Sequence, residues 1–413
     1  MKKIFQNKKL RNLALSHSCS QLANYLLLFV LLGRVFEVTG STVALGVLWA
    51  IYALPLLFLG PFSGAAVDSL SKRKILVIAN LLQVIVIIGY GLTFLGTKNF
   101  LIYALVFVYS IINQFNDPAE QASIPTYLAK KDFVLVNNLF FFADQGALVS
   151  GSILSGLVAS FLSPLAVIFL TAILTLLAAT FAGLLPADIP ANSFPRWREA
   201  VDDFLLKIKE GYVFLANNLL MIYSFGLLLL FQVIVVVFAL ILPGFSSQVL
   251  HLGPYDASWI VVLPVLCGVL FGTYLLTGSQ NRYRKKEWIG FGLLALGLII
   301  LVFSIIVSRL KTNQPLVSLP LSFLAGLSVS FIYAPIRSFI QEESPGEKRG
   351  RVFGTLSFLI ALVTIPPGIF AGMISELLTV KGFLTVIGIS LLIIGYFVLK
   401  RGNEVILAAN HRS

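Results

Sequence analysis

The stretch from Gly64 to Lys74 reads GAAVDSLSKRK and separates two long apolar runs. The run before it covers residues 43–66, and the run after it covers residues 75–95. A helix needs about 20 mostly apolar residues to cross the roughly 30 Å of hydrocarbon in a bilayer. Each run is therefore long enough to span a membrane, and the basic stretch between them is expected to form a short loop at the membrane surface.

The composition extends this pattern to the whole chain. Of 413 residues, 58% are hydrophobic and 12% are charged, whereas about 25% of residues are charged in soluble domains. So few charges cannot cover a water-facing surface, which excludes a soluble enzyme and a disordered scaffold. About 240 apolar residues, at about 20 per span, give about twelve spans. We therefore predict an all-α membrane protein with twelve transmembrane helices.

Polar interruptions place the spans and divide them into two halves. Residues 186–210 are the longest interruption and are expected to form a cytoplasmic linker with an amphipathic segment. The linker separates a six-helix bundle at 1–185 from a second six-helix bundle at 211–413, which ends in a short cytoplasmic tail. The spans are predicted at residues 13–36, 43–66, 75–95, 100–117, 137–161, 164–185, 219–243, 256–277, 288–308, 316–340, 352–376 and 382–400.

The basic residues lie mostly on one side of the predicted membrane. With both termini inside, 25 of the 30 lysines and arginines fall in inner segments. The 5 in outer segments are Arg34, Lys98, Arg309, Lys311 and Lys381. This is the positive-inside pattern of membrane proteins. It predicts a multi-pass protein of the cell (inner or plasma) membrane with both termini cytoplasmic, and it explains the net charge of +12 without nucleic acid.

The two halves share features at similar offsets. A Gly-x-x-x-Gly motif that ends at Gly64 returns with its end at Gly272, 208 residues later, and each copy leads to a basic loop. Pro118 in span 4 returns as Pro335 in span 10, 217 residues later. Duplicated six-helix halves are typical of secondary transporters, which bind their substrates between the halves near the bilayer midplane. We therefore expect two pseudo-symmetric bundles.

The basic loop after span 2 resembles the signature of the major facilitator superfamily, Gly-x-x-x-Asp-x-x-x-Arg/Lys-Arg/Lys. The matching residues are Gly64, Asp68, Lys72 and Arg73. Ser69 and Ser71 stand where the superfamily often has a basic residue and a second glycine. Segments 116–125 and 335–354 resemble a branch of macrolide-efflux-like drug:proton antiporters. The resemblance implies a major facilitator fold, alternating access, and export of small amphipathic, drug-like compounds driven by proton influx.

The resemblance also implies a gate on the cytoplasmic side. Asp68 would pair with Lys72, Arg73 or a neighbouring helix, and this latch would break and re-form as the halves rock. The alternative is a positive-inside anchor with one incidental acid. By the repeat, Glu120 and Arg337 occupy matching positions in the two halves, and we expect them to form an inward-side ion pair.

Asp144 is the acid that stands out, because it lies inside predicted span 5. A charged group at membrane depth costs about 2.5–3.5 kcal/mol on insertion scales, so it is a functional candidate by default. We hypothesise that Asp144 binds the coupling proton or a cationic substrate. The alternatives are that it pairs with a cytoplasmic-side base such as Arg337 or reaches water among the lipid headgroups.

Several other polar residues inside the spans are candidates for a cavity lining. Gln21, Asn24 and Tyr25 share one face of span 1, because they stand at i, i+3 and i+4. The further candidates are Asn113 and Asp117 in span 4 and Tyr223 and Gln232 in span 7. Relatives in the branch often have an acid near Asn24, so its absence moves proton coupling to Asp144 or Asp117. His17 is expected to hydrogen-bond within the bundle rather than to relay protons.

Small residues stand four apart along the middle of span 5, at Ala143, Ala147, Gly151, Ser155 and Ala159. Such a stripe allows a second helix to approach closely. Spans 8 and 11 carry similar stripes. The resemblance favours a moving seam between the halves, and ordinary packing within one half is the alternative.

No nucleotide-binding loop, catalytic triad or metal-ligand cluster is visible in the sequence, so neither a cofactor nor a metal is expected. We predict a transporter, not an enzyme, whose partners are a small-molecule substrate, protons and the lipid bilayer, and which works as a monomer. A transporter of another solute, such as a sugar, a siderophore or a lysolipid, is the main alternative. A membrane-embedded receptor or enzyme is a remote one, because it would need a clustered catalytic set or an appended domain.

Overall fold

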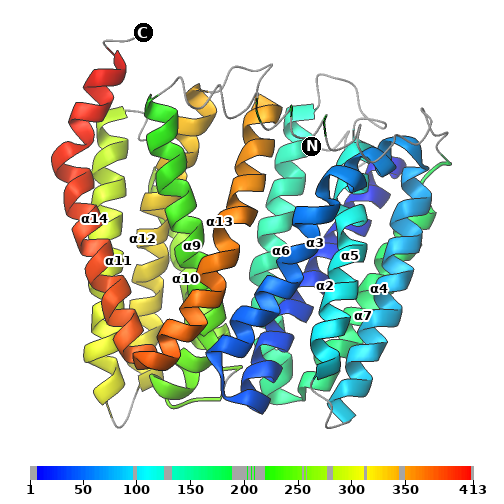
Figure 1. Cartoon of the computed structure of the whole chain (residues 1–413), viewed down its shortest axis with the longest axis horizontal. Coiled ribbons are helices and arrows are strands. Elements are labelled where there is room, and N and C mark those ends of the chain that lie inside the picture. Colours follow the sequence, from blue (N-terminus) through cyan, green and yellow to red (C-terminus); the bar gives the residue numbers. More distant parts are fainter. Residues whose placement is uncertain are drawn as a thin grey trace. The chain divides into compact units, whose positions relative to one another are not determined.

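The fold is entirely helical in the part of the chain that the computed structural model describes (Figure 1). That part comprises residues 7–95, 100–124, 133–187, 202, 206, 209, 219–253, 255–256, 258–276, 282–310, 314–343 and 349–410. Its twelve α-helices are α2 (Lys8–Thr39), α3 (Thr42–Ser69), α4 (Lys72–Leu95), α5 (Phe100–Ser123), α6 (Phe133–Phe161), α7 (Pro164–Gly183), α9 (Leu219–Gln248), α10 (Leu263–Leu276), α11 (Arg282–Ile305), α12 (Gln314–Glu343), α13 (Arg349–Leu377) and α14 (Thr379–Asn410). Each predicted span overlaps one of these helices, so the predicted all-α, twelve-helix membrane fold is confirmed. A π-helical turn, η3 (Ser258–Val262), leads into α10.

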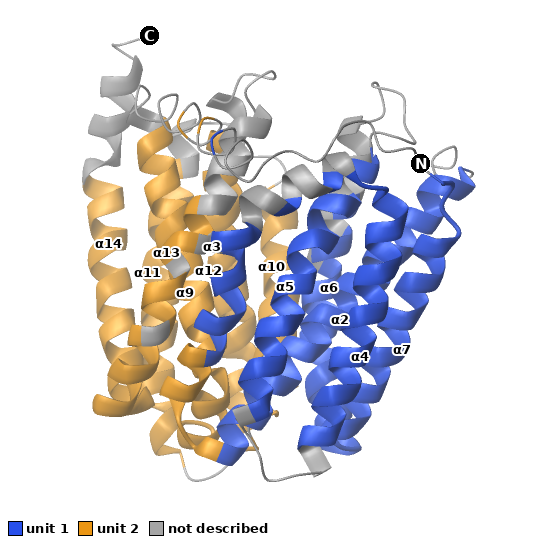
Figure 2. Cartoon of the chain, turned by 45° about the vertical axis from the view of Figure 1, so that its right-hand side comes forward, with its two compact units in different colours: residues 1–38, 48–204 blue, residues 39–47, 205–413 orange. Residues whose placement is uncertain are grey.

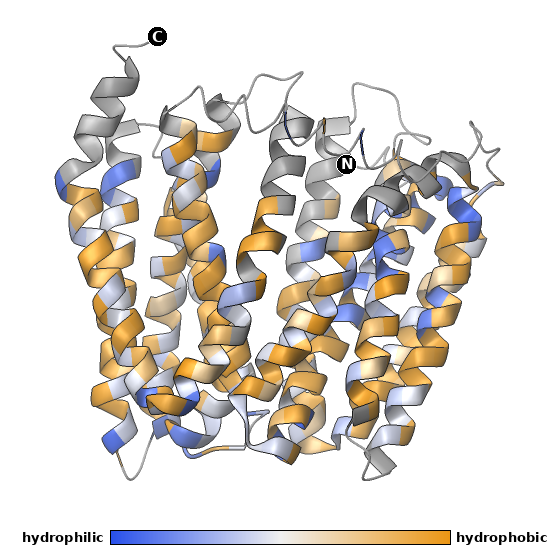
Figure 3. Cartoon of the chain, in the orientation of Figure 1, coloured by the Kyte–Doolittle hydropathy of each residue, from blue (hydrophilic) through white to orange (hydrophobic). Residues whose placement is uncertain are grey.

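The helices have the length and composition of membrane spans. Within the described residues, eight are long and apolar enough to cross a bilayer, and Thr42–Leu56 and Gly146–Phe161 are shorter apolar stretches. Apolar residues dominate along the ribbons (Figure 3). Many large apolar side chains are exposed in the isolated chain, among them Phe58 and Phe161. A protein surface of this kind would be unfavourable in water, whereas lipid tails cover it readily.

Local sequence explains where the helices begin and end. Ser163 precedes α7 in an extended conformation, and its hydroxyl accepts a hydrogen bond from the backbone N–H of Ala166 at 3.1 Å. Pro164 then takes the first helical position, where a missing N–H is harmless. Gly40 links α2 to α3 with a φ of +62°, a left-handed conformation that glycine adopts without steric cost.

The described helices group into two compact units (Figure 2). The first unit comprises Met1–Val38 and Leu48–Phe204, and the second comprises Thr39–Val47 and Leu205–Ser413. In the first unit α4 packs against α5 and α7, and in the second α11 packs against α12 and α14. The third helix of each half therefore contacts the fourth and the sixth, as expected for a repeated architecture. The predicted linker at 186–210 lies mostly outside the described residues, and the predicted domain limits stay predictions.

Two glycines of the small-residue stripes pack inside their own units, and the seam expected for the stripes stays a prediction. A Cβ on Gly151 of α6 would lie 2.6 Å from the Cβ of Tyr25 on α2. Both residues belong to the first unit, so this glycine lets two helices of the same bundle approach closely. In the second unit, a Cβ on Gly268 of α10 would overlap the carbonyl of Phe323 on α12. A small-residue motif identifies a close helix contact but does not identify the partner helix.

The first turn of α3 is held by α13 within the second unit. Thr42 donates its hydroxyl to the carbonyl of Gly372 at 3.0 Å, and its oxygen lies 2.6 Å from the Ser375 hydroxyl. The carboxylate of Glu376 accepts the backbone N–H of Val43 at 3.2 Å and the hydroxyl of Ser41. A carboxylate at a helix N-terminus accepts hydrogen bonds from free N–H groups and interacts favourably with the helix dipole.

Replacing Gly268 with alanine is expected to destabilise the second unit by about 1–3 kcal/mol, because an added methyl group must push apart two tightly packed backbones. The matched control is Gly226→Ala on α9, where an added Cβ meets nothing within 4 Å. Alanine is the better helix former, so the control should be neutral or slightly stabilising. Thermal unfolding of the purified variants in detergent measures the difference. Equal midpoints for the two variants would contradict this close packing.

Candidate functional site

A histidine inside the first unit lies between two carboxylates from different helices. The Nδ1 atom of His17 on α2 lies 2.6 Å from Oε2 of Glu120 on α5. Its Nε2 atom lies 2.9 Å from Oδ1 of Asp144 on α6. The second contact is close enough for an ion pair, although its geometry is poorer than that of a well-formed hydrogen bond. One imidazole therefore joins three helices of this bundle.

The two carboxylates of this trio differ in their surroundings. The side chain of Glu120 is 2% exposed, whereas that of Asp144 is 36% exposed. Oε1 of Glu120 is buried and has no hydrogen-bond partner, although buried carboxylate oxygens normally have one. The ring of Phe140 lies 4.7 Å from that of His17 and covers it with apolar surface. Glu120 is thus enclosed within the unit, and Asp144 is the accessible end of the trio.

A third acid, Asp117, lies one turn from Glu120 on α5. Its two oxygens accept hydrogen bonds from amides: Oδ1 from Nε2 of Gln21 at 3.3 Å, and Oδ2 from Nδ2 of Asn113 at 3.3 Å. Asn113 in turn accepts a hydrogen bond from Gln83 of α4 at 3.2 Å. Amide donors replace the water that a buried carboxylate loses, so they allow an acid to lie at this depth.

A parallel set of amides ties α4 to α5 and α2. Nδ2 of Asn80 donates to the carbonyl of Leu76 at 2.8 Å and lies 3.5 Å from Oδ1 of Asn116. Nδ2 of Asn116 donates to the hydroxyl of Ser20 at 3.0 Å. Asn80, Asn116 and Ser20 are all buried. The acids therefore share a buried polar layer of this unit with a second set of bonded amides rather than lying in an otherwise apolar core.

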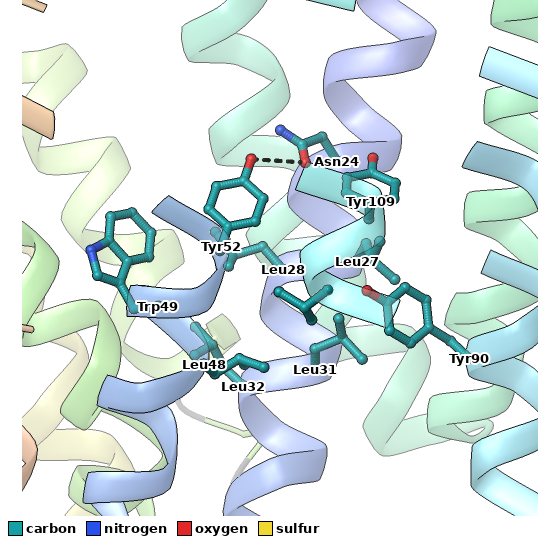
Figure 4. A pocket seen from close by; sticks show the side chains of 11 residues that line it. Asn24, Leu27, Leu28, Leu31, Leu32, Leu48, Trp49, Tyr52, Tyr90 and Tyr109 are labelled. Carbon is teal, nitrogen blue, oxygen red and sulfur yellow. Dashed lines mark hydrogen bonds between the residues drawn. The ribbon is translucent and has the colours of Figure 1, made fainter. Parts of the chain in front are cut away.

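A cavity in the same unit lies near this layer (Figure 4). Its volume is about 20 Å³, enough for about one water molecule. Asn24 lies at its polar end and accepts a hydrogen bond from the hydroxyl of Tyr52 at 3.5 Å (Figure 4). The remaining lining residues are Leu27, Leu28, Leu31, Leu32, Leu48, Trp49, Tyr90, Val106 and Tyr109. The cavity is thus mainly leucine and aromatic, with one amide.

The structure brings together most of the first-half candidates. Gln21 and Asn113 each donate a hydrogen bond to Asp117, and Asn24 lines the cavity. Tyr25 is half-buried and faces Gly151. His17 hydrogen-bonds to Glu120 within the bundle, as predicted, and its other ring nitrogen lies at ion-pair distance from Asp144. Among the described residues, no group of three or more His, Cys, Asp and Glu side chains has the arrangement of a metal site.

The remaining candidates lie elsewhere. Tyr223 and Gln232 are half-buried on α9 of the second unit, and the hydroxyl of Tyr223 is buried without a hydrogen-bond partner. Arg337 on α12 donates to the hydroxyl of Tyr333 at 3.0 Å. Glu120 contacts His17, and its predicted pairing with Arg337, which would join the two units, stays a prediction.

The predicted cytoplasmic latch is described only in part. Gly64 lies within α3, and the side chain of Asp68 is outside the described part of the structure, so the latch stays a prediction. Lys72 is the first residue of α4. The guanidinium of Arg73 donates to the carbonyl of Gly183, at the last turn of α7, at 2.6 Å. A cation at a helix C-terminus is favourable, so Arg73 also fastens α4 to α7.

Sequence reasoning missed the two amides of α4. Asn80 and Gln83 stand three residues apart within the apolar span 75–95, so they share one helix face. Both are buried, at 0% and 1% exposure. Two amides on one face of a lipid-spanning helix indicate a bonded, protein-facing side. That signal was available in the sequence.

A membrane protein with twelve helices in two compact units has the architecture that is typical of secondary transporters. Residues 13–366 match the model of the Major Facilitator Superfamily. The chain belongs to the major facilitator superfamily and is a secondary transporter of that type.

The comparisons with individual proteins agree with this assignment. YfiS, an uncharacterised MFS-type transporter of Bacillus subtilis (strain 168), is 24% identical over 412 residues, which cover 96% of this chain and 94% of YfiS. The crystal structure of the nucleoside transporter NupG matches with a TM-score of 0.67 at 16% identity, covering 97% of this chain and 99% of NupG. A crystal structure of the peptide transporter POT matches with a TM-score of 0.71 at 14% identity, covering 97% and 95% of the two chains. Structural similarity at these identities shows the shared fold.

Proposed function

We propose that this transporter exports small amphipathic compounds from the cytoplasm in exchange for protons. Rocking of residues 1–185 against residues 211–400 would expose the substrate to each side in turn, from a place in the cell membrane with both termini in the cytoplasm. The resemblance to drug:proton antiporters supports the direction of transport. The coupling to protons rests on the acid cluster of the first unit.

The single observation that carries the proposal is the trio of His17, Glu120 and Asp144, with Asp117 beside it. Among the described side chains of this cluster there are three carboxylates and one imidazole, and two of the carboxylates contact the imidazole. If all were ionised, they would carry three negative charges against one positive charge. Two uncompensated charges at membrane depth are costly, and binding a proton removes one of them. The cluster is therefore suited to take up and release a proton.

The same geometry explains how substrate and proton would compete. Protonated His17 neutralises Asp144 at 2.9 Å. A cationic group of a substrate that reaches the more accessible Asp144 would neutralise the same carboxylate, and His17 would then no longer be needed as a cation. Binding of the substrate would release a proton, and binding of a proton would displace the substrate. Such reciprocal coupling is what an antiporter requires.

The second candidate function is transport of another solute, and it is supported by the substrates of the structural neighbours. NupG is a nucleoside transporter and POT is a peptide transporter, and both share this fold. A neutral solute would bind without replacing the charge of His17. In that case transport would depend on the proton gradient in the direction of uptake, so the direction of solute movement separates the two candidates.

Export is expected to lower the accumulation of cationic dyes or macrolides in cells that lack their own pumps. A protonophore should restore accumulation, because it collapses the gradient that drives export. The measurement is fluorescence of cells that express the protein, compared with cells that carry the empty vector. Accumulation that is the same in both, across a broad panel of compounds, would contradict drug export. Uptake of a solute with protons would favour the second candidate instead.

A further inference from the structure

Asp117 stands at the end of a chain of amides that begins on another helix. Gln83 of α4, which is 1% exposed, donates through Nε2 to Oδ1 of Asn113 at 3.2 Å. Asn113 donates through Nδ2 to Oδ2 of Asp117 at 3.3 Å. On the other side, Gln21 of α2 donates to Oδ1 of the same carboxylate at 3.3 Å. The two oxygens of Asp117 thus face different amides. Oδ2 faces Asn113, which is itself bonded to Gln83, and Oδ1 faces Gln21.

The charge on Asp117 fixes the direction of this chain. An ionised carboxylate only accepts hydrogen bonds, so Asn113 must present its NH₂ group to Oδ2. The carbonyl of Asn113 then points toward Gln83, which must present its own NH₂ group. The observed directions agree at each link. Gln83 therefore stabilises Asn113 as a donor toward Asp117.

Protonation changes what Asp117 needs from its neighbours, because one oxygen then carries a donor. If the proton were on Oδ2, Asn113 would have to turn and accept it, and its NH₂ group would face the NH₂ group of Gln83. Gln83 would have to turn as well, so two buried amides would reorient together. If the proton were on Oδ1, only Gln21 would turn, and the bond from Asn113 to Oδ2 would persist.

We propose that Gln83 is a positioning residue that directs the proton taken up by Asp117 to Oδ1, the oxygen that faces Gln21 on α2. Gln83 acts through Asn113, to which it donates its hydrogen bond. This inference rests on the proposed function in that it treats Asp117 as a member of the proton-binding cluster. The titratable groups that interact with Asp117 are His17, Tyr25, Tyr52, Tyr109, Glu120 and Asp144. They influence how readily a proton binds, whereas the amides decide which oxygen receives it.

Infrared titration of the purified protein in detergent tests this placement without any transport. The carboxylic-acid C=O stretch of Asp117 is identified as the band that Asp117→Asn removes. With the proton on Oδ1, the carbonyl oxygen is Oδ2, which accepts from Asn113. Asn113→Leu should therefore move the band to higher frequency, and Gln21→Leu should move it much less. The opposite order would overturn the proposal, and so would the absence of an Asp117 band in the wild-type protein.

Gln83 itself is tested by comparing two buried amides of α4. Gln83→Leu should convert one band into two, because Asn113 can then turn without a second buried amide turning with it, and the proton populates both oxygens. Asn80→Leu, the control, also removes a buried amide but should leave one band. In the Asn113→Leu background, Gln83→Leu should have no further effect. Gln83→Met replaces the leucine variant if that variant fails to fold.

A single unchanged band in Gln83→Leu, or a split band in Asn80→Leu, would overturn the role of Gln83. These results are independent of dye export. If export fails while the bands behave as expected, the proposed substrate or direction is wrong and the proton placement stands. If export succeeds while Gln83→Leu matches the wild type, the proposed function stands and this inference is wrong.

Discussion

Replacing His17 with leucine is expected to abolish proton-driven export and to destabilise the protein by about 3–5 kcal/mol. The loss follows from Glu120, whose side chain is 2% exposed and whose contact to His17 is 2.6 Å. Removing one partner of a buried ion pair leaves the other charge without compensation, which is the most costly way to change such a pair. Thermal unfolding in detergent and dye accumulation in cells measure the two effects.

A double variant separates stability from transport. His17→Leu combined with Glu120→Leu removes both members of the pair, and replacing a buried pair with apolar side chains is often neutral. The double variant should therefore recover most of the stability of the wild type but none of its export. If His17→Leu alone unfolds at the wild-type temperature and exports dye normally, the pair has neither of the roles assigned to it.

Replacing Asp144 with asparagine is expected to slow proton-driven export by more than about tenfold, which corresponds to a coupling free energy above about 1.4 kcal/mol. The amide keeps the size of the side chain but neither binds a proton nor carries a charge to be neutralised by His17 or a cation. Because the side chain is 36% exposed, the fold should tolerate the change. Dye accumulation at equal expression level measures the effect.

Glu37 offers a matched control for Asp144. It is an exposed acid on α2 that forms an ion pair with Arg34 at 3.2 Å, and exposed pairs contribute little. Glu37→Gln should leave export and stability unchanged. Normal export by Asp144→Asn would remove Asp144 from the coupling path and would leave Glu120 and Asp117 as the acids to test. Asp144→Glu, which keeps the charge, should retain part of the export.

The fold followed from the sequence because its determinants are local. A run of about 20 apolar residues predicts a span without knowledge of its neighbours, and the residues 43–66, for example, lie within α3 (Thr42–Ser69). The excess of basic residues on one predicted side of the membrane can likewise be counted from the order of the spans along the chain alone. The predicted span boundaries differ from the helix boundaries where a helix continues beyond its apolar run. An example is α14, which continues to Asn410.

The candidate site could be predicted from the sequence only in part, because its residues come from three helices. Asp144, Asp117 and Glu120 were each recognisable as acids within or beside apolar spans. Their meeting point was not recognisable, because it depends on how α2, α5 and α6 are rotated about their axes. His17 and Glu120 are 103 residues apart, and no local pattern relates them. The repeat predicted Arg337 as a partner of Glu120, which stays a prediction, but it gave no indication of the contact with His17 within the unit.

Proton coupling is tested most directly with the purified protein in sealed liposomes that enclose a pH-sensitive dye. An imposed gradient of a cationic substrate, with the membrane potential clamped, should drive protons in the opposite direction across the membrane. Asp144→Asn should abolish this proton movement, and Glu37→Gln should preserve it. Substrate movement with no proton movement, or proton movement that persists in Asp144→Asn, would contradict exchange through the His17–Glu120–Asp144 trio.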